Sequence, residues 1–448
     1  MNSRAMNMSE IPRDRTARAS LRPPRIVYMA GIDVSRDNGA GVNERGFVRA
    51  VADRPDIVCV LPAPAFPENY QDARHRYVFG HRGVAWRFPL YMAGLARASF
   101  RLSRLCRIGG VVVRIGLAAL VPLWVARILR VPLFLKTYSS RNAYVQVPWK
   151  TLVFSRGKWN RQMLRVRLLD AVFRSLERAV IRRAAIIDCP STTCRDVVAA
   201  KPGMAGKQVV AIPNGADVGF YRPCDPGRIR SRLGIPPGAF VVGYAGAMGG
   251  EVRFLDVLLE ALIRWGGRTP VFGLMLGHGS SLEPFRNRVK AAGMEGRILF
   301  PGFVPNREIP EWISAMDLAA DMTAVAFTLR GETVHGSYSQ KIPQYLACGV
   351  PVLAWDLPDT CFLRQHGIGF LASLQDPDSL RKTVEAALNE AESERAARKR
   401  RAREYAVKHL SCDVLASMRL RLWRAAVNGM AKGGAVAQPS SMREQWPA

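Results

Sequence analysis

Short apolar runs alternate with stretches of helical periodicity along the first half of the chain. Each apolar run has the length of a β-strand, and the stretches between them have the apolar spacing of helices. The predicted strands are residues 25–30, 57–61, 131–138 and 185–191, and the predicted helices are residues 84–110, 117–130 and 160–183. Ser191 or Thr192 is placed to cap the helix that follows the last of these strands. The alternation predicts a Rossmann-like domain.

The same alternation restarts after Val209. The apolar, strand-length runs are VVAIPNGAD, AFVVGYAGAM, PVFGLMLGHG, RILFPGFV, LAADM and GVPVLAW, and helical stretches separate them. Strands and helices that alternate in this way indicate a parallel sheet covered on both faces. The predicted fold class is therefore α/β, with two Rossmann-like, doubly wound domains in series.

The domain boundaries follow from these two runs of alternation. Residues 25–204 are the predicted N-terminal domain, and residues 205–390 are the predicted C-terminal domain. A flexible basic tail at 1–24 precedes them, a helical segment rich in Ala and Arg follows at 391–428, and residues 429–448 are expected to be disordered.

The charge of the chain is strongly positive and unevenly distributed. The formal net charge is +29, and residues 1–200 hold 34 Lys and Arg against 13 Asp and Glu. No acidic residue lies between Asp72 and Asp170, whereas this stretch holds nineteen Lys and Arg. A genome that favours Arg over Lys accounts for part of the excess but not for the missing acids. The distribution predicts an anionic partner of the N-terminal half.

The identity of this anionic partner is narrowed by what the sequence lacks. It has no zinc-finger spacing, no basic-region heptad and no aromatic RNA-binding signature, so no nucleic-acid partner is expected. Arg97, Arg101, Arg104 and Arg107 lie along one face of the predicted helix 84–110, with Phe100 off this stripe. Two interpretations stay open, a membrane-facing basic amphipathic helix and an ordinary helix with solvated arginines. An anionic membrane surface is the partner we expect.

Location follows from the cysteines and from hydropathy. The eight cysteines form no C-x-x-C pair, which is typical of a reduced, cytoplasmic protein without a zinc site. The lipophilic run at residues 115–126 is too short to cross a bilayer, and the basic tail has no apolar core of a signal peptide. We expect a cytoplasmic protein, peripheral on the inner face of the membrane.

Glycine turns follow the apolar strands of the second domain. They are Asn214-Gly215, Gly246 to Gly250, Gly277-His278-Gly279 and Gly302. Glycine at a strand end lets backbone N–H groups and a helix N-terminus come close to a phosphate. Because ligands of open α/β sheets bind at the carboxyl ends of the strands, several such turns predict one shared crevice.

Residues 205 to about 390 resemble a known family in several motifs that occur in the same order. VVAIPNGADVGFYRP, VVGYAGAMGG, LMLGHGS and ILFPGFVPNREIPEWISAMDLAADM are each similar to a segment of the group 1 retaining glycosyltransferases, and SQKIPQYLACGVPVLAW resembles their K-x-x-E-Y-x-A-x-G-x-P-V signature. The resemblance implies the GT-B fold, in which two domains face each other across a cleft. It further implies hexose transfer from a nucleotide diphosphate sugar to a lipid-linked or polysaccharide acceptor, with no metal and no further cofactor.

The resemblance also implies roles for individual residues. Lys341 would neutralise the donor diphosphate as the sugar leaves, and Arg253 is either a second such cation or a surface arginine. Base contacts would come from the backbone of Phe303 and Val304. The other expected donor contacts are Gly39, Gly41, Asn214, Gly215, Gly246, His278 and Gln344.

The sequence departs from the family pattern at acidic and histidine positions. Gln344 stands where the family has a ribose-binding Glu, and Gln accepts hydrogen bonds through only one oxygen. Gly336 stands where many members have a second Glu, and Glu332 or His335 is near enough to substitute for it. Thr137 and Tyr138 follow a strand after which many members have His. A non-catalytic scaffold, or an epimerase or phosphorylase on the same fold, therefore stays an alternative.

Overall fold

A computed structural model gives the fold of most of the chain. The residues it describes are 24–29, 39–63, 76–79, 88–137, 161–249, 254–265, 271–337, 339–376 and 378–431. Arg253 and almost all of the two predicted tails lie outside these residues.

The first sheet is parallel throughout. Its strands are β1 (Arg25–Met29), β2 (Ile57–Ala63), β3 (Arg76–Phe79), β4 (Ile108–Val113), β5 (Leu133–Leu135), β6 (Ala184–Cys189) and β7 (Gln208–Ala211). Their order is β3-β2-β1-β4-β5-β6-β7, so the direction of winding reverses between β1 and β4. This is the Rossmann order that the alternation predicts.

One strand was assigned to the wrong domain. Residues 209–211 were expected to open the second domain, but Val209 pairs with Ile187 of β6, and β7 closes the first sheet. The first sheet therefore extends to Ala211, past the predicted boundary at residue 204. The apolar run itself was recognised, but periodicity does not reveal which sheet a strand joins.

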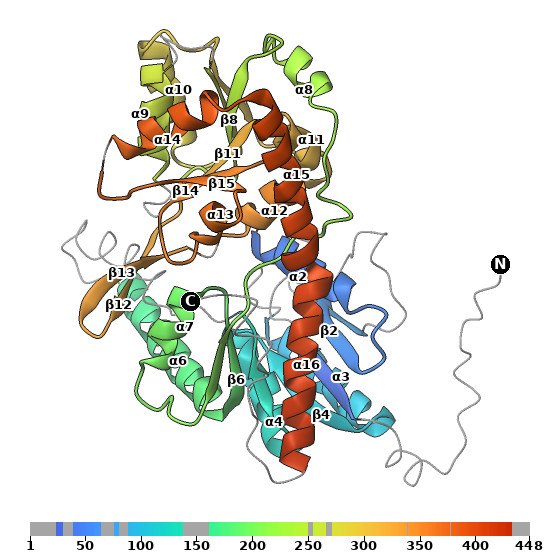
Figure 1. The fold of residues 1–448 in the computed structure, drawn as a ribbon. Coiled ribbons are helices and arrows are strands. Elements are labelled where there is room, and N and C mark those ends of the chain that lie inside the picture. Colours follow the sequence, from blue (N-terminus) through green and yellow to red (C-terminus); the bar gives the residue numbers. More distant parts are fainter. Residues whose placement is uncertain are drawn as a thin grey trace, which may run out of the picture.

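Helices cover both faces of the first sheet, as Figure 1 shows. Alternate side chains of β1 point to opposite faces, with Val27 and Met29 in one core and Ile26 and Tyr28 in the other. The Val27 face is covered by α3 (Phe88–Leu105), α4 (Leu120–Ile128), α6 (Arg161–Arg183) and α7 (Thr192–Ala199), and the opposite face by α2 (Gly39–Ala50) and α16 (Cys412–Ala431). The Ser191 hydroxyl accepts from the Cys194 N–H and caps α7, as predicted.

The helix predicted for residues 84–110 is shorter than expected. It is α3, which ends at Leu105, because the β-branched run that follows forms β4. Arg107 therefore lies beyond the helix, while Arg97, Arg101 and Arg104 are exposed on it. Phe100 was expected off the arginine stripe, but it is exposed and the Arg104 guanidinium lies 4.3 Å from its ring centroid.

The second sheet repeats the same topology. Its strands are β8 (Phe240–Ala245), β9 (Val271–Leu276), β10 (Ile298–Gly302), β11 (Leu318–Asp321), β14 (Val352–Trp355) and β15 (Gly369–Ala372), in the order β10-β9-β8-β11-β14-β15. One face packs on α9 (Leu255–Trp265), α10 (Leu282–Ala291) and α14 (Ser379–Leu388). The other packs on α8 (Gly227–Arg232), α11 (Ile309–Ser314), α12 (Lys341–Ala347), α13 (Phe362–Gln365) and α15 (Glu392–His409).

The helical segment predicted at 391–428 consists of two helices that join the two domains. Helix α15 packs on the second domain, where the Arg403 guanidinium donates to the carbonyls of Val218, Tyr221 and Ala347. The helix is interrupted at Leu410 and Ser411, and α16 then runs down the first domain in Figure 1. Trp423 of α16 stacks on Phe134 of β5 in the core of that domain. Helix α16 is therefore part of the first domain.

A β-hairpin that the sequence did not predict extends from the second domain. It consists of β12 (Val325–Leu329) and β13 (Glu332–Gly336), which pair antiparallel. Val325 and Phe327 are buried in the core of the first domain, against α7. The hairpin thus ties the two domains together at the left of Figure 1.

Candidate functional site

The glycine turns of the second domain meet at the carboxyl ends of its strands. The Gly246 N–H, after β8, donates to the Leu276 carbonyl at 3.0 Å, and the Gly277 N–H, after β9, donates to the Gly302 carbonyl at 2.8 Å. The Met248 N–H donates to the His278 carbonyl at 2.8 Å. Three separate turns thus form one hydrogen-bonded surface at the carboxyl ends of β8, β9 and β10.

This surface leaves no room for side chains at two of its glycines. A Cβ on Gly277 would lie 1.9 Å from the Gly246 carbonyl oxygen, and one on Gly279 would lie 1.9 Å from the Met248 carbonyl oxygen. Both glycines also have positive φ, 129° and 152°. The two turns are therefore packed backbone against backbone, which is the construction that lets a phosphate approach main-chain groups closely.

Lys341 reaches over these turns from the start of α12. Its Cε lies 2.6 Å from the position that a Cβ on Gly246 would take, so a side chain there would displace the end of the lysine. The ammonium lies 3.8 Å from Asp321 Oδ1 and 5.4 Å from the Tyr244 ring centroid. Asp321 is buried, and its Oδ2 accepts no hydrogen bond within the described part of the chain. A half-buried cation is thus held at the glycine surface.

Tyr345 fixes α12 relative to the end of β8. Its hydroxyl accepts from the Ala245 N–H at 2.9 Å and donates to the Ala245 carbonyl at 3.2 Å. Burial raises the pKa of this hydroxyl well above its usual value, and the nearby Asp321 carboxylate adds to the shift. The phenol therefore stays protonated and holds Lys341 in register with Gly246.

His278, Phe303 and Val304 flank the glycine surface. His278 and Phe303 are exposed and meet edge to face, with ring centroids 5.6 Å apart. The Val304 side chain is buried in the core, so only its backbone is available to a ligand. These three expected donor contacts therefore lie together next to the turn of Gly277.

Asn214 and Gly215 lie where the two domains join. Asn43 of α2 donates to Asn214 Oδ1 at 2.8 Å, and Gln340 donates to the Gly215 carbonyl at 2.6 Å. A Cβ on Gly215 would lie 3.0 Å from the Leu410 carbonyl oxygen. The structure thus gives both residues a part in the domain junction, as their motif led us to expect, while their contact with the donor stays a prediction.

Gln344 faces the first domain across a small pocket. The pocket encloses only about 30 Å³ and is lined by Arg45 and Gly46 of α2, by Asp217 and Asn306, and by Gln344. Arg45 is buried at this junction. Gly39 and Gly41 belong to the first turn of the same helix, so α2 brings its predicted glycine contacts to the boundary between the domains.

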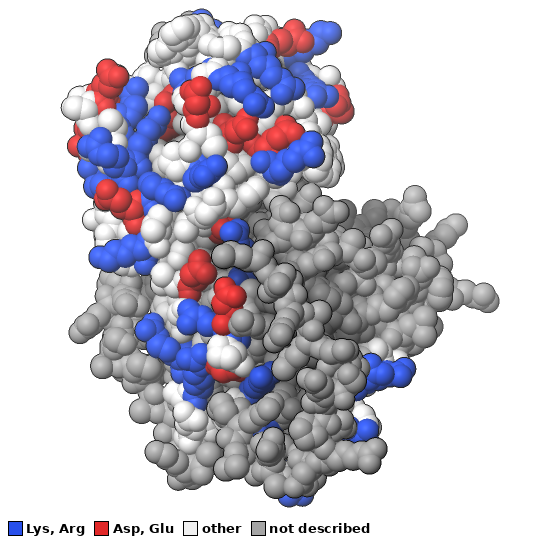
Figure 2. Space-filling model, turned by 90° about the vertical axis from the view of Figure 1, so that its right-hand side faces the viewer, with Lys and Arg blue, Asp and Glu red and all other residues white. Residues whose placement is uncertain are grey.

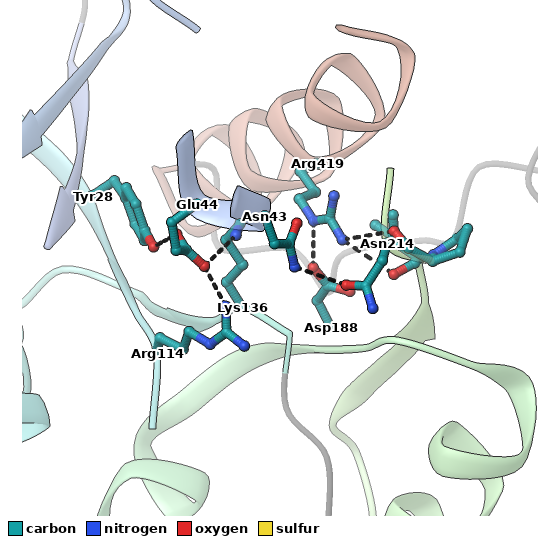
Figure 3. A network of polar contacts seen from close by, with 10 residues as sticks. Tyr28, Asn43, Glu44, Arg114, Lys136, Asp188, Asn214 and Arg419 are labelled. Atoms are coloured by element: carbon teal, nitrogen blue, oxygen red, sulfur yellow. Dashed lines mark hydrogen bonds and ion pairs between the residues drawn. The ribbon is translucent and has the colours of Figure 1, made fainter. Parts of the chain in front are cut away.

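A cluster of charged side chains lies at the carboxyl ends of β4 and β5 in the first domain. Figure 3 shows Glu44 of α2 receiving hydrogen bonds from Tyr28, Arg114 and Lys136. Glu44 and Lys136 are fully buried, and their charged groups are 3.0 Å apart. Arg114 and Lys136 directly follow β4 and β5. Only the folded chain reveals this cluster, because its members are far apart in sequence.

The cluster has shifted ionisation equilibria. Burial alone would raise the pKa of Glu44, but attraction to Lys136 and Arg114 lowers it to about 2. Burial lowers the pKa of Lys136 to about 8, although Glu44 opposes the shift. Arg419 of α16 extends the network by donating to Asp188 at 2.5 Å, while burial raises the pKa of Asp188. These charges fix α2 and α16 to the sheet.

Gly336, where the resemblance leads one to expect Glu, is closed by neighbouring groups. A Cβ there would lie 2.7 Å from Asp359 Oδ2 and 2.9 Å from Thr193 Cβ. Asp359 accepts from the Thr192 hydroxyl at 2.7 Å, and from the Thr193 and Ser337 N–H groups at 3.0 Å each. A carboxylate of the second domain therefore caps α7 of the first domain, and the space of the missing side chain is filled.

The candidate substitutes for this acid lie on the hairpin. Glu332 pairs with Leu329 at the exposed end of β13, and His335 pairs with Ala326. Within the described ranges, no group of three or more His, Cys, Asp or Glu is arranged to hold a metal ion. None of the helices in those ranges is both long and apolar enough to cross a membrane.

Comparisons with known proteins agree with this geometry. Residues 239–390 match the model of the family described as glycosyl transferases group 1. The chain is 27% identical over 240 residues to the 2-deoxystreptamine glucosyltransferase of Streptomyces kanamyceticus, covering 53% of this chain and 56% of that protein. It is 28% identical over 199 residues to the D-inositol 3-phosphate glycosyltransferase of a Nocardioides species, covering 40% and 41%. The chain thus spans only about half the length of these relatives.

Solved structures match nearly the whole chain. The crystal structure of Anabaena Alr3699/HepE in complex with UDP has a TM-score of 0.62 at 17% identity, covering 89% of this chain and 98% of that one. Sucrose-phosphate synthase from Thermosynechococcus elongatus has a TM-score of 0.63 at 14% identity, with the same coverage. At these identities the likeness establishes the fold, which is GT-B, as predicted.

Proposed function

Because residues 239–390 form a domain of the group 1 glycosyltransferases, we propose that this protein is a retaining hexosyltransferase. Its donor is a nucleotide diphosphate sugar, and its acceptor is a saccharide or a lipid-linked saccharide of cell-envelope or exopolysaccharide synthesis. The observation that carries the proposal is Lys341, whose side chain crosses the glycine surface next to Gly246.

The diphosphate of the donor would lie on this glycine surface. Its oxygens would accept hydrogen bonds from main-chain N–H groups, and the Lys341 ammonium would pair with the charge that develops on the leaving diphosphate. Asp321 and Tyr345 act through Lys341, because one is its ion-pair partner and the other holds α12 in place. In this scheme the cation is a side chain, and we propose a reaction that needs no metal ion and no further cofactor.

The nucleoside would extend from the glycine surface toward the domain junction. His278 and Phe303 offer an exposed aromatic pair, and Val304 offers its backbone. Gln344 and Arg45 line the adjacent pocket, where an amide and a guanidinium suit ribose hydroxyls and phosphate oxygens. We propose that Arg253, which follows the glycine turn after β8 in the sequence, pairs with the same diphosphate.

A second candidate function is a scaffold that keeps the fold without turnover. The observation that favours it is Gly336, because Asp359 and Thr193 fill the space of the acid that many relatives have there. Asp359 is itself a carboxylate at this place, but α7 and Ser337 occupy both of its oxygens. A scaffold of this kind would bind neither UDP nor GDP.

The test is release of nucleoside diphosphate from a panel of UDP- and GDP-hexoses, with and without saccharide acceptors. The proposal expects acceptor-dependent release by the wild type and its loss in Lys341→Ala. Lys382→Ala serves as the matched control, since Lys382 is an exposed lysine of the same domain. Release that needs no acceptor would favour an epimerase, and no release from any donor would favour the scaffold.

A further inference from the structure

Two neighbouring helices of the first domain expose large apolar side chains. Leu120, Trp124 and Ile128 of α4 are 52%, 65% and 63% exposed, and Phe100 of α3 is 58% exposed. Four of the eight large hydrophobic side chains that are exposed among the described residues thus belong to these two helices. Helices α3 and α4 pack against each other on the same face of the first sheet.

The exposed residues form a continuous ridge on α4. Leu120, Trp124 and Ile128 follow one another at intervals of four, so they line one face of the helix, and exposed Arg127 lies on the same face. Pro122 and Ala126 are buried on the opposite face against the sheet. The ridge is therefore not needed for the core of its own domain.

The face of α3 that points to solvent carries positive charge beside the apolar ridge of α4. Arg97, Phe100, Arg101 and Arg104 stand at i, i+3, i+4 and i+7, while Leu95, Ser99 and Leu102 are buried on the other face. We call these four residues of α3, together with Leu120, Trp124, Arg127 and Ile128 of α4, the α3–α4 surface. It combines four large apolar side chains with four arginines and holds no acid.

The distribution of charge along the chain indicates which kind of partner the α3–α4 surface binds. Over the second domain, basic and acidic side chains interleave, as the upper part of Figure 2 shows. By contrast, no acidic residue occurs between Asp72 and Asp170, which is the stretch that contains both α3 and α4. An anionic lipid surface attracts such a field, and exposed Trp, Leu and Ile side chains partition into the interface below the head groups. A tryptophan beside arginines is typical of that boundary.

We propose that the α3–α4 surface docks the protein onto an anionic bilayer, with Leu120, Trp124 and Ile128 inserted and the arginines among the lipid head groups. This inference rests on the proposed function only in placing a lipid-linked acceptor near the enzyme. The surface lies on the N-terminal domain, whereas the glycine surface and Lys341 lie on the other domain. The docking residues are therefore distinct from those of the proposed donor site.

The test is co-sedimentation of the full chain with vesicles of phosphatidylglycerol and, separately, of phosphatidylcholine. We expect binding to phosphatidylglycerol only. Trp124→Ala with Ile128→Ala should weaken this binding about tenfold, because two large side chains no longer leave water. Arg97→Glu with Arg101→Glu should weaken it by at least as much. Val257→Ala and Arg264→Glu on α9 are the matched controls, since both side chains are exposed on the second domain.

Equal binding to the two lipids, or full binding by the Trp124 and Ile128 variant, would overturn the proposal. So would a wild-type dimer that this variant dissociates and that binds no vesicles, because the surface would then be a contact between two copies. Calorimetric titration of the same variants with UDP and GDP separates the two proposals. Vesicle binding without nucleotide binding would leave the docking surface standing and remove the donor site, and the reverse result would do the opposite.

Discussion

The two domains have the same order of strands, but the strand ends that the structure describes differ in chemistry. In the second domain, Gly246 and Gly277 make backbone-to-backbone turns over which Lys341 reaches. In the first domain, Glu44 and Lys136 occupy the equivalent edge as a fully buried ion pair. The same topology thus carries a surface of glycine turns beside a lysine in one domain and, among the described residues, a buried ion pair in the other. Binding chemistry depends on the residues at the strand ends, while the topology only brings these residues together.

The largest expected effect is the loss of activity when Lys341 of the second domain is replaced. Lys341→Ala should lower kcat/KM for the donor by about a thousandfold, or about 4 kcal/mol, because the leaving diphosphate loses its cation. The thermal unfolding midpoint should stay close to that of the wild type. Steady-state kinetics and calorimetry on this variant and on Lys382→Ala measure both quantities. Unchanged turnover in Lys341→Ala would remove the lysine from the site.

The next effect concerns the stability of the first domain. Glu44→Gln leaves Lys136 and Arg114 buried beside an uncharged group, and it should lower the free energy of unfolding by about 3 kcal/mol at pH 7. Urea titration measures this loss, and Glu283→Gln, in an exposed ion pair of the second domain, is the control. Equal stabilities of Glu44→Gln and the wild type would show that the buried cluster does not stabilise the fold.

The same residue predicts how stability depends on pH. The pKa of Glu44 is lowered from its ordinary 4.5 to about 2, so its contribution is fully present above pH 4.5 and is lost as the pH falls toward 2. The difference corresponds to about 3 kcal/mol. Urea titrations between pH 5 and pH 2 should therefore show a steeper loss of stability in the wild type than in Glu44→Gln. Parallel curves would contradict the lowered pKa.

A smaller effect is expected on the nucleotide affinity of the second domain. Gln344→Glu supplies a second acceptor oxygen and a charge to the pocket between α2 and α12, so a ribose hydroxyl could be bound more tightly. We expect nucleoside diphosphate affinity to rise about tenfold, or about 1.4 kcal/mol. Calorimetric titration of this variant against the wild type checks it. Weaker binding would mean that the pocket does not receive the ribose.

The smallest effect tests the contact between the domains. Asp359→Asn keeps the size of the side chain but loses one acceptor among the bonds to Thr192, Thr193 and Ser337. We expect the free energy of unfolding to fall by about 1 kcal/mol. Urea titration followed by Trp fluorescence measures it, and a stability equal to that of the wild type would show that the α7 cap contributes nothing.

Sequence patterns predicted the strands and helices of this protein better than the contacts between them. The alternation of strands and helices identified both sheets, and the glycine turns were expected to share one crevice, because strand ends of one parallel sheet meet at one edge. The assignment of β7 to the second domain was wrong, since an apolar run does not encode its pairing partner. The hairpin of β12 and β13 was missed for a similar reason, because its buried side chains pack on a helix far away in sequence.

Prediction from sequence was limited in the same way for the single residues of the candidate site. Lys341 was found by its motif, and the structure places it over Gly246. The closure of Gly336 by Asp359 and Thr193 was not predictable, because the three residues come from separate segments. Likewise, the apolar ridge of Leu120, Trp124 and Ile128 reads in sequence like an ordinary buried helix face. Only the position of α4 on the sheet shows that this face is exposed.

The most direct test of the central claim is calorimetric titration of the wild type and of Lys341→Ala with UDP and with GDP. If the glycine surface and Lys341 form a donor site, one of the two nucleotides should bind the wild type at a single site per chain, and Lys341→Ala should bind it much more weakly. Absence of binding by both nucleotides to the folded wild type, or equal binding by the variant, would contradict the account.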